Sequence, residues 1–158
     1  MKNIFKRSGA ALISLVLLLV LAVSAGAASS QNVGVKFWKE RSDKESMANS
    51  GIDPDRTATL TRQANGTYTL TLPVMQVSKL GVTGYLSGLT IGDVTYDGTL
   101  TGDFNKATAV LTIKNLPASV LTGSDVNKSV LVTCNIQMDL QVLGEINTSA
   151  RMCIWNQK

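Results

Sequence analysis

The segment VLVTCNIQMDLQV, residues 130–142, carries an apolar side chain at every even position and a polar one at every odd position after Leu131. A period of two is that of a β-strand with one buried and one solvated face. Shorter runs with the same period recur from residue 31 onward, and turn signals separate them at intervals of roughly ten residues. This spacing is typical of an all-β, antiparallel two-sheet sandwich, and we expect seven or eight strands.

The hairpin around Ala64-Asn65-Gly66 illustrates how the apolar pattern fixes register. A two-residue Asn-Gly turn would pair Leu60 with Thr71 and oppose an apolar face to a polar one. A three-residue loop, with Gly66 in the left-handed region, pairs Leu60 with Leu70 instead. The sequence therefore predicts the three-residue loop.

The N-terminal segment has the pattern of an export signal. An apolar run from Ala10 to Val23 follows three basic residues, Lys2, Lys6 and Arg7. Ala25-Gly26-Ala27 then supplies the small residues that a signal peptidase requires. The run is short for a bilayer span, which disfavours a membrane anchor. We therefore expect residues 1–27 to be a signal peptide and residues 28–158 to form one secreted domain, released or held at the cell surface by a partner.

The composition excludes several classes of function. The chain contains no histidine, which excludes Ser-His-Asp and Cys-His catalysis and any histidine-ligated metal or haem site. Without its first 27 residues the chain has twelve Lys and Arg against eleven Asp and Glu, so no basic stripe for nucleic acid is expected. Asp and Glu are scattered singly among turns, and we predict that the protein is not an enzyme.

The two cysteines, Cys134 and Cys153, lie on the two arms of the terminal hairpin. A tight turn at Leu143-Gly144 would set them opposite one another and permit a disulfide, as expected for an exported chain. That register opposes the apolar face of the first arm to a polar face of the second. A three-residue loop matches the apolar faces but directs the two sulfurs to opposite sides of the sheet. Both arrangements remain open at the level of sequence.

A short helical segment interrupts the β pattern after the first strand. Ser42 and Glu45 have the spacing of a capping box, and Gly51 is a natural helix stop. We expect one or two helical turns over residues 43–50, closing one end of the sandwich. From the residues alone, Met47 would be an adaptable filler at that end.

The order of several segments resembles that of a near-iron transporter (NEAT) domain, the haem- and haemoprotein-binding module of Gram-positive surface proteins. The matching pieces include VGVKFWKE, ESMANSGIDPDRTATLTR and ANGTYTLTLPV, and they cover most of the chain after residue 27. Most telling is Ser-Met-Ala-Asn followed by a Pro-containing link and a Gly-turned hairpin. The resemblance implies an immunoglobulin-like sandwich that acts in haem acquisition and binds haem or a host haemoprotein.

The resemblance also implies roles for particular residues. In that family the short helix forms a lip over haem, so Ser46 would bond a propionate and Met47 would contact the porphyrin. Four basic residues nearby would add cations: Lys36, Lys39, Arg41 and Lys44.

The family's iron-ligating tyrosines are missing from this chain. Their positions on the last strand correspond to Glu145 and Ser149, or after a shift of one to Ile146 and Ala150, and no tyrosine follows Tyr96. Thioether ligation is then an option, by Met47 together with Met152 or Met138. The alternative for Met138 and Met152 is that both are core residues of their strands.

Two other functions agree with the missing tyrosines. One is haemoprotein binding without haem coordination, which some domains of the family perform. The other is an exported immunoglobulin-like module with an adhesive or structural role and no haem.

Overall fold

The computed structural model describes residues 28–79, 81–139 and 144–158. The predicted signal peptide, residues 1–27, lies outside this part of the chain. Within the described residues, no helix is both long and apolar enough to cross a membrane.

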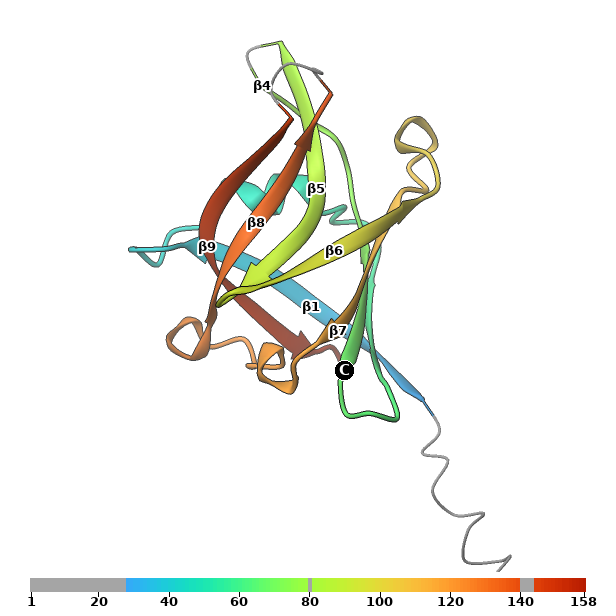
Figure 1. The fold of residues 1–158 in the computed structure, drawn as a ribbon, viewed down its shortest axis with the longest axis vertical. Coiled ribbons are helices and arrows are strands. Elements are labelled where there is room, and N and C mark those ends of the chain that lie inside the picture. The colour runs from blue at the N-terminus through green and yellow to red at the C-terminus, as the bar shows by residue number, and fades with distance from the viewer. Residues whose placement is uncertain (1–27, 80, 140–143) are drawn as a thin grey trace, which may run out of the picture.

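The described chain is built from β-strands joined by turns and short 3-10 helices (Figure 1). In chain order, the strands are β1 (Ser29–Lys39), β2 (Ala58–Arg62), β3 (Tyr68–Pro73), β4 (Val77–Lys79), β5 (Val82–Ile91), β6 (Val94–Thr101), β7 (Val110–Leu116), β8 (Val130–Met138) and β9 (Glu145–Asn156). The 3-10 helices are η1 (Met47–Gly51), η2 (Phe104–Lys106), η3 (Ala118–Val120) and η4 (Val126–Lys128).

The strands form one antiparallel sheet in the order β4-β5-β6-β7-β3-β2-β1-β9-β8, and β5 also pairs with β8. Eight strands therefore close on themselves, and the short β4 is added at the edge of β5. The prediction of an all-β, antiparallel fold is confirmed. The strands form one continuous sheet, however, and not the two separate sheets that were expected. The β5–β8 pairing closes the sheet, and β9 lies between β8, which it pairs with over its first two thirds, and β1, which it pairs with over Ala150–Asn156. A closed sheet exposes fewer strand edges than an open one.

The predicted hairpin register is confirmed. Leu60 pairs with Leu70, the amide of Gln63 donates to the carbonyl of Thr67, and Gly66 has a φ of 82°. A positive φ is inexpensive for glycine. Strand β5 runs without a break from Val82 to Ile91, with a register irregularity between Leu86 and Gly88 in its pairing with β8.

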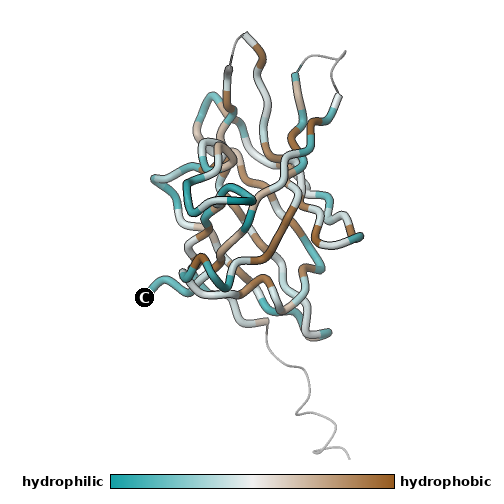
Figure 2. Tube along the Cα trace, turned by 90° about the vertical axis from the view of Figure 1, so that its left-hand side faces the viewer, coloured by the Kyte–Doolittle hydropathy of each residue, from teal (hydrophilic) through white to brown (hydrophobic). Residues whose placement is uncertain are grey.

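The core lies inside the closed sheet. Its largest fully buried side chains include Phe37, Leu60, Leu70, Leu72, Leu89, Leu111, Ile113, Leu116, Met152 and Ile154. The hydrophobic parts of the chain follow the crossing strands in the middle of the molecule, while many hydrophilic parts lie on the outer connections (Figure 2). Matching the apolar faces of all strands across the core is the main stabilising contribution to the fold.

The terminal hairpin follows the apolar-face register and not the disulfide register. Cys134 lies opposite Thr148, and Ile136 lies opposite Ile146. Both cysteines are buried and free. Cys134 points into the core, whereas the thiol of Cys153 lies 3.6 Å from the carbonyl oxygen of Asp125, next to η4.

Burial of Cys134 predicts a loss of stability in alkali. Desolvation raises the pKa of this thiol from its ordinary value of 9.0 to about 12. The folded state then holds its proton more tightly than the unfolded state. Stability contributed by the neutral thiol is complete below pH 9 and is lost as the pH rises from 9 towards 12. Between pH 8 and 10.5 we expect wild type to lose about 2 kcal/mol more than Cys134→Ala in urea unfolding. Equal losses of unfolding free energy in wild type and Cys134→Ala would contradict the raised pKa of the Cys134 thiol.

Candidate ligand pocket

A lip, defined here as Ser46 and η1, covers one end of the closed sheet (Figure 1). Ser46 is its N-cap: the backbone is extended at φ −77°, ψ 149°, and its Oγ accepts a hydrogen bond from the amide of Ala48 at 3.3 Å. The predicted capping box of Ser42 and Glu45 is wrong. Glu45 instead forms an isolated antiparallel bridge with Trp38, so the chain is still extended there and the helix begins later.

Asn49 fixes the lip to β1. Its Oδ1 accepts from the amide of Phe37 at 2.8 Å, and its Nδ2 donates to the carbonyl oxygens of Phe37 at 2.7 Å and Ser46 at 3.1 Å. The β1–β2 pairing ends at Val33, so the edge of β1 at Phe37 has no strand beside it. The Asn49 side chain satisfies that edge in place of a strand.

Loss of this anchor is expected to loosen the lip. Asn49→Ala removes three hydrogen bonds and leaves both backbone groups of Phe37 with fewer partners, which predicts a loss of about 1–3 kcal/mol in unfolding free energy. Hydrogen exchange at the amide of Ala48 should become faster. Asn127→Ala is the matched control, because Asn127 is exposed and its side chain bonds only within the η4 turn, to Asp125. Equal effects of the two changes would contradict an anchoring role for Asn49.

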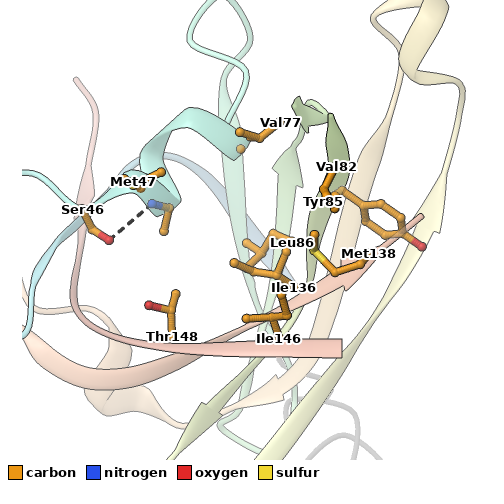
Figure 3. Close-up of a pocket in the computed structure, with 13 residues that line it drawn as sticks. Ser46, Met47, Val77, Val82, Tyr85, Leu86, Ile136, Met138, Ile146 and Thr148 are labelled. Atoms are coloured by element: carbon orange, nitrogen blue, oxygen red, sulfur yellow. Dashed lines mark hydrogen bonds between the residues drawn. The ribbon is translucent and has the colours of Figure 1, made fainter. Parts of the chain in front are cut away.

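Beneath the lip lies a cavity of about 280 Å³. Its lining comes from three parts of the chain and is mostly apolar (Figure 3). The lining residues are Ser46, Met47, Ala48 and Gly51 of the lip, Val77, Val82, Gly84, Tyr85 and Leu86 of β4 and β5, and Ile136, Met138, Ile146 and Thr148 of β8 and β9. The β5–β8 pairing brings the last two groups together.

The two hydroxyls nearest the lip lie towards one end of the cavity (Figure 3). In Figure 3, Ser46 and Thr148 lie towards one end, and Val82 and Met138 lie towards the other. The Ser46 hydroxyl accepts one hydrogen bond and keeps its own proton to donate. A ligand with an apolar body and an acceptor group at one edge therefore suits this cavity.

The structure separates the methionines that sequence analysis considered together. Met47 lies on the lip and is 59% exposed. Met138 also lines the cavity, and its Sδ packs against β5: a Cβ added to Gly84 would lie 2.8 Å from it. Met152 is 0% exposed within the core and does not line the cavity.

The last strand presents Ile146 to the cavity. Of the positions considered for the family's tyrosines, Ile146 lines the cavity and Ala150 is buried on the same face of β9. Glu145 and Ser149 are exposed. From β9, Ile146 and Thr148 thus line the cavity, and neither can ligate iron as a tyrosine does.

The basic residues near the lip do not line the cavity. Lys36 pairs with Glu45, and its Nζ lies 4.7 Å from the centre of the Trp38 ring. Arg151, from β9, pairs with Asp43 at 2.7 Å. Of Lys36, Lys39, Arg41 and Lys44, all within the described chain, none supplies the expected cation to the cavity.

Sequence reasoning missed the contributions of β4, β5 and Thr148. A partial signal was Gly84, since only a glycine lets β5 approach β8 so closely at this point: an added Cβ would also lie 3.0 Å from the carbonyl oxygen of Gln137. Tyr85 lines the rim, but its ring turns away from the lip towards Phe104, at a centroid distance of 5.2 Å (Figure 3).

A second cavity of about 200 Å³ lies near Asp53, Arg56 and Trp155. Its charged groups are engaged in the fold, because the Arg56 guanidinium donates to the carbonyl oxygens of Ala107 and Ala109 at 3.0 Å each. Within the described residues, no three Cys, Asp or Glu side chains gather as metal ligands would. The cavity beneath the lip is therefore the better candidate site.

Comparison with known proteins supports the fold. No protein-family model and no curated protein sequence matches this chain. Among solved structures, the chain is similar to the NEAT5 domain of IsdX2, a B. anthracis hemophore, in complex with heme, and to a point mutant of that domain with heme. In each case the identity is 11%, the match covers 83% of this chain and 98% of the other, and the TM-score is 0.53. The chain therefore has a NEAT-like fold.

Proposed function

We propose that this protein is an exported binding module that takes haem as its cargo in the cavity beneath the lip. The observation that carries the proposal is the placement of Ser46 and Met47 on one wall of an apolar cavity, facing Ile136 and Ile146 on the other. The similarity in fold to a hemophore domain solved with heme supports this choice. It also supports the prediction that the chain is a binding module and not an enzyme.

The porphyrin ring fits the residues present. The lining is largely apolar, and about 280 Å³ is close to the lower end of protein ligand pockets, roughly 300–1,000 Å³. A ring would therefore enter by one edge and leave the rest at the mouth. Met47 and Ile146, 59% and 43% exposed, are the apolar side chains that the protruding part would cover.

The polar edge of the ligand would lie at the Ser46 end of the cavity. The Ser46 hydroxyl would donate to a propionate, as the family resemblance implies, and Thr148 adds a second hydroxyl nearby. Met47 would pack on the ring. A role for Met152 as an iron ligand would require its side chain to leave the core, so the thioethers at the cavity are those of Met47 and Met138.

Titration of residues 28–158 with ferric and ferrous haem tests the proposal through the Soret band. We expect saturable binding of one haem per chain, weakened about 3- to 30-fold by Met47→Ala through lost ring contact. Met75→Ala is the matched control, since Met75 is 37% exposed and does not line the cavity. Absence of saturable binding would contradict the proposal and favour an adhesive or structural role; a haemoglobin pull-down would then test haemoprotein binding.

Export is part of the same proposal. A signal peptide at residues 1–27 predicts that the secreted protein begins at Ala28, which N-terminal sequencing would measure. A secreted chain that retains residues 1–27 would contradict it.

A further inference from the structure

We infer that the cavity recognises the tetrapyrrole ring and not its metal, so that metal-free porphyrin binds as tightly as haem. This inference rests on the proposed function and specifies its ligand class. The residues fit the macrocycle, as described above, but they do not fit the iron.

The side chains that bind haem iron strongly as single protein ligands are histidine, cysteine thiolate and tyrosine. The chain has no histidine. Cys134 and Cys153 are buried and do not line the cavity. Tyr85 is the tyrosine at the cavity, and its ring lies against Phe104 on the side away from the lip (Figure 3).

The thioethers do not replace these ligands. The sulfur of Met138 is packed on the backbone of β5 at Gly84, and Met152 is enclosed in the core. Met47 alone stands on the lip. A single neutral thioether with no stronger ligand opposite is therefore expected to bind iron little more strongly than water does.

The wall opposite the lip is hydrocarbon. Ile136 and Ile146 are directly paired across β8 and β9, and both line the cavity beside Leu86. Contact with this wall depends on the shape and apolar area of the ligand, which haem and metal-free porphyrin share. The hydroxyls of Ser46 and Thr148 meet the carboxylate edge, which the two ligands also share.

The test compares three ligands on residues 28–158: ferric haem, zinc protoporphyrin and metal-free protoporphyrin IX, by absorbance and fluorescence titration. We expect one ligand per chain and dissociation constants within about threefold of one another. Met47→Ala should weaken all three by the same factor, because it removes ring contact and no metal bond.

Haem bound at least about 30-fold more tightly than metal-free protoporphyrin would overturn the inference and leave the proposed function standing. Binding of none of the three would overturn both.

Discussion

Ile146→Glu is expected to abolish tetrapyrrole binding, with at least about a 100-fold loss of affinity, while the protein stays folded. The new carboxylate would face the apolar wall formed with Ile136. A bound ring would displace the water around this carboxylate, and no basic side chain lines the cavity to compensate the negative charge. In the free protein the side chain is 43% exposed, so the carboxylate keeps its contact with solvent and the unfolding free energy should change little.

Val94→Glu provides the matched control for this variant. Val94 lies on β6, is 52% exposed and does not line the cavity. The Val94→Glu variant introduces the same charge, and we expect it to bind porphyrin with the affinity of wild type. Porphyrin titration of both variants, with thermal unfolding measured in parallel, distinguishes a loss of binding from a loss of stability. Wild-type affinity in Ile146→Glu would mean that the ligand does not enter beneath the lip.

Ile146→Tyr is expected to have the second-largest effect, and in the opposite direction. It places a phenol on the β9 position that faces the lip, where a phenolate oxygen can bind ferric iron. We expect at least about a tenfold gain in affinity for ferric haem and no gain for metal-free protoporphyrin. A phenolate-to-iron absorption band should appear with haem alone.

Ile146→Phe is the control for the ring of the tyrosine. It carries the same aromatic area without the oxygen and should change the affinities for haem and metal-free protoporphyrin equally. If Ile146→Tyr strengthened the binding of both ligands to the same extent, the gain would come from ring stacking, and the expectation that a phenolate at this position reaches the iron would be wrong.

The strand registers could be predicted from the sequence because the apolar period specifies them locally. Leu60 pairs with Leu70, and the even face of β8 meets the even face of β9, since any odd shift would bury polar side chains. The sequence left the disulfide between Cys134 and Cys153 open, and the observed register, with Cys134 opposite Thr148, decides against it.

The limits of the lip could not be predicted, because Ser42 and Ser46 are both suitable caps. The choice between them depends on tertiary contacts. Trp38 of β1 forms a bridge with Glu45, which keeps the chain extended there, and Asn49 then holds η1 against Phe37. Local propensity carries no information on these contacts.

The far wall of the cavity depends on non-local pairing. β4 has three residues, too few for a period, and closure between β5 and β8 joins segments about fifty residues apart, as in the pair of Leu86 with Ile136. Met138 and Met152 share the even face of the hairpin arms. Met138 lies at the cavity and Met152 in the core because the sheet closes at the β5–β8 pairing, which the sequence pattern does not reveal.

The most direct test is methyl NMR of residues 28–158 with metal-free protoporphyrin IX, whose ring current shifts nearby resonances. We predict the largest shifts at Met47, Leu86, Ile136 and Ile146, and none at Val94. Shifts confined to residues around the second cavity, such as Val35 and Leu72, or no saturable shifts at all, would contradict the claim that the cavity beneath the lip binds a tetrapyrrole.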